Sequence, residues 1–342
     1  MSKFFSDVLT IVNGKNQRAV ENPNGKYPIY GSGGIMGYAD NYLCDAETVI
    51  IGRKGSINKP IFVEEPFWNV DTAFGLVANK TVLLPKYLFY FCVNFDFEKL
   101  NKTVTIPSLT KSDLLKIEID IPSIIIQQSV VEKLDRVGNC IELLKMQLNK
   151  LDELIKSRFV EMFGDPIENT KKLVTKALKD VLILKAGDFT AASDISEVPT
   201  DKKIYPCYGG NGIRGYVSDY NQEGEYPLVG RQGALSGNVQ FAKGKFQNTE
   251  HALLVTPLVE MNNIWLNQLL INLDLKRYQT GAAQPGLSVK NLQEIPIVAV
   301  SIEEQDQFAD FVTQVEKQKA TVQQSIDKLE TLKKSLMQEF FG

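Results

Sequence analysis

Residues 27–31 read YPIYG, and the same pattern returns as YPCYG at residues 205–209. The offset between the two stretches, from position 27 to position 205, is 178 residues. The same offset relates the Gly-Arg-x-Gly stretch at residues 52–55 to a second one at residues 230–233. Short repeats build solenoids, whereas a period this long indicates two copies of one domain-sized folding unit. The sequence therefore predicts two similar domains related by an internal pseudo-twofold repeat.

The composition is that of a globular protein. Hydrophobic residues make up 44% and charged residues 23% of the 342 positions, so each copy is long enough to bury its own core. No apolar run is long enough to span a membrane and the start of the chain does not resemble a secretory signal, so we expect a cytoplasmic protein without membrane contact. The four cysteines are scattered singly, which favours reduced structural thiols over zinc or disulfides.

Each copy begins with short β-branched runs separated by glycine turns. The expected strands are residues 48–52, 59–63 and 74–78 in the first copy, and residues 226–230, 237–241 and 251–256 in the second. A helix is expected at residues 86–94, with its counterpart near residues 262–272. Each globular unit is therefore predicted to be mixed α/β.

Each copy ends in a long amphipathic helix. Apolar residues recur every seven positions on two tracks from Gln127 onward, and the second copy keeps the register from Phe308 with interruptions at Lys319 and Lys333. Each helix would be on the order of 55 Å long, and neither can bury its stripe alone. We expect the two helices to pack as an antiparallel coiled coil that carries one globular unit at either end. The expected boundaries are residues 1–122 and 165–301 for the globular units, and 123–164 and 302–342 for the helices.

The end of the first helix carries a family resemblance. Residues 151–166, LDELIKSRFVEMFGDP, with a degenerate copy at residues 329–342, resemble the central region of the specificity subunit of type I restriction-modification enzymes. The Tyr-Pro-x-Tyr-Gly, Gly-Arg-x-Gly and Pro-x-Leu elements resemble that family's target recognition domains. The resemblance covers essentially the whole chain and the order of its parts.

The resemblance implies a non-catalytic DNA-binding subunit. In that family each target recognition domain reads one half of a split site in double-stranded DNA, and the helices set the spacer and dock two methyltransferase subunits. The chain itself would hold no cofactor, and S-adenosylmethionine would belong to the partner methyltransferase. The sequence leaves open whether restriction subunits join the complex.

Two loops in each copy combine the side chains that contact DNA. Arginine suits bidentate contact with phosphate or guanine, and asparagine or glutamine suits adenine. The first loop is Gly-Arg-x-Gly, and the second precedes and includes Pro-x-Leu. With the glycine turn at residues 209–215, these loops supply the candidate residues Arg53, Lys54, Ser56, Asn58, Lys59, Lys102, Thr103 and Thr105 in the first copy, and Asn211, Arg214, Arg231, Gln232, Ser236, Asn238, Arg277, Gln279, Thr280 and Gln284 in the second.

Differences between the copies suggest separate tasks for these side chains. Arg53 and Arg231 occupy matching positions, which favours a shared contact with the DNA backbone, whereas Lys54 faces Gln232 in the alignment and is a candidate for sequence readout. The alternative is an ordinary turn with solvated charge. The glycine stretch at residues 31–37 resembles a dinucleotide fingerprint, but the helix and acidic residue of that motif are missing, which favours a structural turn.

Three observations bear on the alternatives. The net charge of −3 is unusual for an isolated duplex binder, and it is accommodated if partner subunits neutralise most phosphates. No methyltransferase motif, Walker loop or zinc spacing is present, which argues against a DNA-processing enzyme. The single histidine, His251, lacks partners for a metal site, although contact with a base is an alternative. A protein-binding scaffold is the remaining alternative, but it would not require diverging loops on a shared frame.

Overall fold

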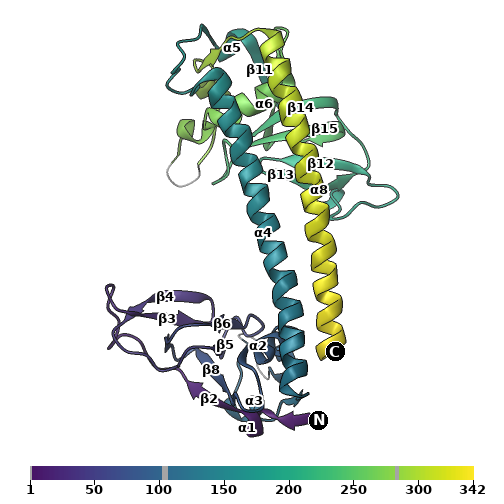
Figure 1. Ribbon diagram of the computed structural model, residues 1–342. Coiled ribbons are helices and arrows are strands. Elements are labelled where there is room, and N and C mark those ends of the chain that lie inside the picture. Colours follow the sequence, from purple (N-terminus) through teal and green to yellow (C-terminus); the bar gives the residue numbers. More distant parts are fainter. Residues whose placement is uncertain (1, 102–106, 282–284) are drawn as a thin grey trace. The chain divides into compact units, whose positions relative to one another are not determined.

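The computed structural model describes residues 2–101, 107–281 and 285–342 (Figure 1). The chain forms two compact units, Met1–Lys145 with Gln324–Gly342, and Met146–Gln323. The division falls within both long helices, α4 (Ile124–Phe163) and α8 (Ile302–Phe341). We call Met1–Lys145 with Gln324–Gly342 the first unit, and Met146–Gln323 the second unit.

The first unit contains nine strands and four shorter helices in its described residues. The strands are β1 (Ser2–Phe4), β2 (Leu9–Asn13), β3 (Tyr27–Gly31), β4 (Gly34–Ala39), β5 (Thr48–Gly52), β6 (Ile61–Val63), β7 (Trp68–Asn69), β8 (Ala73–Ala78) and β9 (Glu118–Asp120). The shorter helices are α1 (Phe5–Val8), α2 (Pro85–Asn94), the 3-10 helix η1 (Phe97–Leu100) and α3 (Lys111–Leu114). The strand orders are β2-β8-β5-β6, β4-β3-β7 and β1-β9.

The second unit repeats this plan. Its strands are β10 (Thr175–Ala177), β11 (Leu182–Ala186), β12 (Tyr205–Gly209), β13 (Gly212–Val217), β14 (Gln222–Gly230), β15 (Val239–Asn248), β16 (Ala252–Pro257) and β17 (Pro296–Val298). Its helices are α5 (Leu178–Val181), η2 (Ala192–Asp194), α6 (Asn263–Asn272), η3 (Leu275–Tyr278) and α7 (Val289–Leu292). Both units contain helices and strands, which confirms the mixed α/β prediction. The repeat is also confirmed, because the hairpins β3–β4 and β12–β13 share even the position of a bulge, after Ile29 and after Cys207.

The two units differ at one strand. In the second unit β15 runs without interruption and joins six of the eight strands into one sheet, in the order β11-β16-β14-β15-β12-β13, while β10 pairs with β17. In the first unit its counterpart is split into β6 and β7, and Pro66 lies between them. Proline lacks a backbone N–H and cannot donate to a central ladder, so the sheet separates at this residue.

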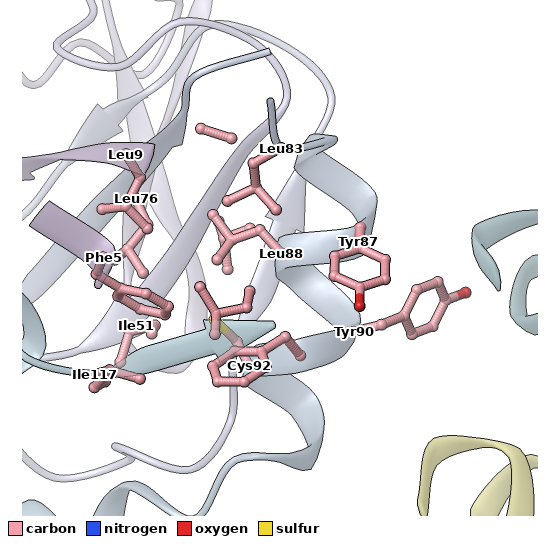
Figure 2. Packing of buried hydrophobic residues seen from close by; sticks show 14 of the residues in the cluster. Phe5, Leu9, Ile51, Leu76, Leu83, Tyr87, Leu88, Tyr90, Cys92 and Ile117 are labelled. Atoms are coloured by element: carbon pink, nitrogen blue, oxygen red, sulfur yellow. The ribbon is translucent and has the colours of Figure 1, made fainter. Parts of the chain in front are cut away.

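The core of the first unit lies between its four-stranded sheet and helix α2. Figure 2 shows Phe5, Ile51 and Leu76 facing Leu88 and Cys92, all of them buried. Alternate residues of β5 and β8 enter this core, because successive side chains of a strand point to opposite faces: Val49 and Ile51 on β5, and Phe74 and Leu76 on β8.

The long helices pair in antiparallel fashion within each unit. In the first unit Lys145 lies 3.8 Å from Glu330, and Lys133 stacks over the ring of Phe340 further along. In the second unit Asp152 meets Lys319 at 2.7 Å, and Phe159 packs against Phe308. The residue numbers rise on one helix as they fall on the other, as the antiparallel prediction requires.

The interruption of the second seam at Lys319 has a local explanation. Its ammonium group bonds to Asp152 on α4 and to Glu316 on its own helix, at 2.7 and 2.9 Å. The lysine therefore crosses the seam with its charge paired on both helices. None of the helices within residues 2–101, 107–281 and 285–342 is both long and apolar enough to cross a membrane.

Candidate nucleic-acid interface

The two candidate loops of the first unit are joined by backbone hydrogen bonds. The N–H of Leu109 donates to the carbonyl of Arg53 at 2.9 Å, and the N–H of Gly55 donates to the carbonyl of Pro107 at 3.1 Å. Lys54 and Ser108 form an antiparallel bridge between these bonds. The Gly-Arg-x-Gly loop and the Pro-x-Leu segment therefore form one surface, although about fifty residues separate them in the sequence.

The second unit repeats each of these contacts. Leu287 donates to the carbonyl of Arg231 at 2.8 Å, and Gly233 donates to the carbonyl of Pro285 at 2.9 Å. Gln232 bridges Gly286 in the place of Lys54 and Ser108. Gly55 and Gly233 both adopt positive φ, +78° and +79°, which other residues rarely adopt and which allows their N–H groups to turn toward the proline carbonyl.

In both units a third segment packs on the Gly-Arg-x-Gly loop. This segment is the hairpin turn before β4 in the first unit and the hairpin turn before β13 in the second. A Cβ atom on Gly52 would lie 2.9 Å from the Cβ of Ser32, and one on Gly230 would lie 2.1 Å from the carbonyl oxygen of Gly210. Only glycine permits so close an approach of the turn to the loop. The glycine stretch is thus a hairpin turn, as expected, and it contributes to the surface formed by the other two loops.

Predicted residues line a shallow hollow on the second unit. Arg231, Gln232 and Thr280 surround it together with the segment from Pro285 to Ser288. Gln232 and Thr280 are exposed and Arg231 is half-buried. This hollow is therefore accessible and combines a guanidinium, an amide and a hydroxyl group.

The first unit presents a more basic version of this surface. Arg53, Lys54, Ser56 and Lys59 are all exposed. The guanidinium of Arg53 stacks over the ring of Phe74, with 5.7 Å between its central carbon and the ring centroid, which orients the side chain while its charge stays in solvent.

Several predicted side chains hold the loops together. In the first unit Asn58 accepts from the N–H of Phe97 at 2.7 Å and so ties the loop to η1. In the second unit Gln279 donates to the carbonyl of Ser236, and Asn238 donates to Asn211 at 2.8 Å. These amides are partly committed to the loop framework.

The remaining predicted residues divide into three groups. Arg214 and Arg277 are exposed on β13 and η3. Ser236 is fully buried, so its side chain cannot reach a ligand, and we remove it from the candidate contact residues. Lys102, Thr103, Thr105 and Gln284 lie outside the described residues.

Sequence reasoning gave His251 only an alternative role in base contact and did not consider its neighbour Glu250, and both lie at this surface. The ring of His251 contacts Gln232 through Nδ1 at 2.8 Å and Glu250 through Nε2 at 3.1 Å. The backbone also connects them, because the N–H of Arg231 donates to the carbonyl of His251, as the N–H of Arg53 does to Thr72. The signal available in the sequence was the alignment of the only histidine with Thr72, beside the Gly-Arg-x-Gly motif.

Comparison with known protein families identifies the family to which this repeated fold belongs. The type I restriction modification DNA specificity domain matches the chain twice, at residues 1–153 and 170–331. The chain belongs to this family of DNA specificity proteins. The two matches coincide with the repeat seen in the sequence and in the fold.

Relatives of the family extend this result. The chain is 33% identical over 290 residues to the specificity subunit of the EcoprrI type I restriction enzyme of Escherichia coli, covering 78% of this chain and 69% of the relative. It is 25% identical to a putative type I specificity subunit of Mycoplasma pneumoniae, covering 64% of this chain and 82% of that protein.

A solved structure shares the fold. The S subunit of a type I restriction-modification system from M. genitalium matches with a TM-score of 0.67 at 17% identity, covering all of this chain and 96% of that one. The relatives from E. coli and M. pneumoniae are named as type I specificity subunits, in agreement with the DNA specificity domain found twice in this chain. Among the described residues no group of three or more histidine, cysteine or carboxylate side chains is placed to hold a metal ion.

Proposed function

We propose that each unit reads one half of a bipartite DNA site through the surface formed by its three loops. The observation that carries this proposal is the conserved backbone frame of these loops beside divergent side chains. Arg53 and Arg231 begin the same loop in both units, whereas Lys54 is replaced by Gln232 and Thr72 by His251. A shared frame with different polar groups is what two readers of different base sequences require.

The shared arginines then contact phosphates and the variable residues read base edges. Arg53 is exposed and held over Phe74, so its guanidinium can contact DNA with little loss of side-chain freedom. Arg231 lies at the rim of the hollow beside Gln232. Contacts with phosphates position a protein on the duplex, and contacts with bases specify the site.

Partner subunits complete the complex. The chain has a net charge of −3, so most of the charge that neutralises the DNA backbone comes from elsewhere. We assign this role to two methyltransferase subunits that dock on the long helices and carry S-adenosylmethionine. The helices α4 and α8 also fix the gap between the half-sites, because a helix has a constant rise per residue.

The test is methylation sequencing of a genome in which this chain is produced with its partner methyltransferase. A second strain carries the chain with residues 27–107 replaced by those of a relative. We expect a split adenine motif in which the exchange alters one half alone. A motif that changes in both halves would refute independent reading, and an active methyltransferase without any motif would favour the scaffold alternative.

A further inference from the structure

The only histidine of the chain lies between a carboxylate and an amide. Its Nε2 is 3.1 Å from Glu250 Oε1, and its Nδ1 is 2.8 Å from Gln232 Oε1. The second oxygen of Glu250 is buried, and no hydrogen-bond partner for it is found among the described residues. The imidazole is therefore held at both nitrogens, while Gln232 is exposed at the edge of the hollow.

The protonation state of His251 decides which way the Gln232 amide can face. A neutral imidazole has one N–H donor and one acceptor nitrogen. The Glu250 carboxylate can only accept, so Nε2 carries the proton and Nδ1 must accept. Gln232 then has to turn its NH₂ group toward the ring, which leaves its oxygen outward.

The charged imidazole reverses this requirement. Both of its nitrogens donate, so Gln232 turns its oxygen toward Nδ1, which is the orientation with 2.8 Å between Nδ1 and Oε1. The NH₂ group then faces outward. The amide oxygen and nitrogen are nearly equal in size, so the side chain can turn over without a change in packing.

We propose that Gln232 reads a base in the half-site of the second unit and that the proton on His251 selects which group it presents. This rests on the proposed function of the loop. With His251 charged, the outward NH₂ group matches the O6 and N7 acceptors of guanine. With His251 neutral, the outward oxygen accepts from the amino group of cytosine or adenine.

The first unit lacks this device. Lys54 and Thr72 stand in the places of Gln232 and His251, and a lysine ammonium donates whatever the state of its neighbours. Glu250 on its own turn is a charged group in contact with the histidine ring, and Arg231 on the loop after β14 donates its backbone N–H to the carbonyl of His251. Arg214 on β13 lies close enough to act, with Glu250, on the nearby thiol of Cys207.

The second unit has an imidazole at this position and the first unit does not. We therefore expect the reading of the second half-site to depend on pH and the reading of the first half-site not to.

The hydrogen-bonding scheme is tested first on the full-length chain without DNA. Histidine labelled with ¹⁵N gives a single imidazole, whose two nitrogen shifts report the tautomer. At about pH 8 we expect the proton on the nitrogen that faces Glu250, and Glu250→Gln should give a mixture of tautomers. A proton on the nitrogen that faces Gln232 would overturn the scheme.

The reading is tested on the chain assembled with its methyltransferase subunits. The assembly is bound to a library of randomised duplexes at about pH 6 and about pH 8, and the bound DNA is sequenced. We expect the base preference at one position of the second half-site to shift about tenfold between the two conditions, and the first half-site to stay unchanged. No shift, or an equal shift in both half-sites, would overturn the proposal.

Three variants separate this inference from the function on which it rests. His251→Thr, which introduces the residue of the first unit, should lose the pH dependence of the base preference in the second half-site. Gln232→Glu should favour a base with an amino group at both pH values.

A pH shift that survives in His251→Thr would overturn the role of the histidine. If Arg231→Ala leaves binding to every sequence unchanged, the loop does not contact DNA, and the reading role fails even where the labelled tautomer is as expected.

Discussion

The backbone N–H of Leu287 donates to the carbonyl oxygen of Arg231 at 2.8 Å, and this bond ties the Pro-x-Leu segment to the Gly-Arg-x-Gly loop. Leu109 and Arg53 make the same bond at 2.9 Å in the first unit. Leu109 and Leu287 are buried while the arginines reach solvent, so each bond anchors a polar loop to the core beneath it. A change that displaces one loop of a unit will therefore displace the other.

A methyl group at Gly52 should disrupt the first surface. Its Cβ would lie 2.4 Å from the carbonyl oxygen of Ser56 and 2.9 Å from Ser32, and overpacking of this kind costs about 1–3 kcal/mol. We expect Gly52→Ala to weaken reading of the first half-site and leave the second intact, as measured by methylation sequencing. Gly33→Ala is the matched control, because no atom lies within 4 Å of its added Cβ. Equal effects of the two substitutions would contradict the close approach of the turn.

Arg231→Ala should weaken binding to DNA of any sequence. The loss of one phosphate contact is expected to lower the dependence of log affinity on log salt by about 1. Gln232→Lys, which introduces the residue of the first unit, should instead change the preferred base in the second half-site with the salt dependence less affected. Binding of assembled complexes to matched and mismatched duplexes at several salt concentrations distinguishes the two. A uniform loss from both variants would rule out a reading role for Gln232.

Lys319 should make the stability of the second unit depend on pH in the alkaline range. Burial is the largest influence and lowers its pKa, but the bonds to Asp152 and Glu316 together outweigh it, so the net pKa lies above the ordinary 10.5. A group whose pKa is raised on folding stabilises below its unfolded-state pKa and loses that contribution as pH rises through the folded value.

We therefore expect Lys319→Ala to lower the free energy of unfolding by about 1 kcal/mol at neutral pH, as judged by denaturant titration. Lys319→Met, which keeps the apolar stem, controls for lost packing. The native chain should have a higher free energy of unfolding than Lys319→Met at neutral pH, and this advantage should shrink above about pH 10.5, the ordinary pKa of lysine. A difference that stays constant up to pH 12 would show that the ion pairs contribute nothing.

The four thiols should react at very different rates. Cys140 is exposed on α4, whereas Cys44, Cys92 and Cys207 are buried. Burial raises the pKa of Cys44 to about 12 and raises the pKa of Cys92 and Cys207 as well, so little thiolate forms near neutral pH. We expect one rapidly modified thiol in the native chain and four after denaturation. Cys140→Ser should abolish the rapid reaction, and rapid labelling that persists in this variant would contradict the assignment.

The gap between half-sites should follow the length of the helices. Insertion of four residues near Asn149 in α4, matched by four near Asp327 in α8, adds about 6 Å to each helix at 1.5 Å per residue. We expect a longer gap with both half-sites unchanged, read from the methylated motif. Altered half-site bases with the original gap would show that the helices do not set the spacer.

The elements of the fold were largely readable from the sequence. The run at residues 48–52 became β5, and the helices expected at residues 86–94 and near 262–272 became α2 and α6 with small shifts at their starts. Local signals suffice here because β-branched runs ended by glycine and heptad spacing constrain the backbone directly. The split of one strand at Pro66 was not predicted, although proline is the signal for it.

The candidate site was only partly readable. The sequence identified the Gly-Arg-x-Gly and Pro-x-Leu stretches in both copies, but it did not show that they are bonded to each other. It placed Ser236 among the contact residues, whereas the fold buries it. Contacts between distant segments depend on how strands pair, which no local pattern encodes.

The sequence by itself determined the repeat, the mixed α/β class and the long antiparallel helices, because each follows from residue spacing along the chain. The family was identified from the resemblance of its motifs. Only the tertiary structure decided which polar groups share a surface. It brought His251 and Glu250, which follow β15, to Gln232, which follows β14, because the neighbouring strands β14 and β16 place their connecting loops side by side. The physical reason is that hydrogen-bond partners are selected by distance in space, and the sheet sets that distance.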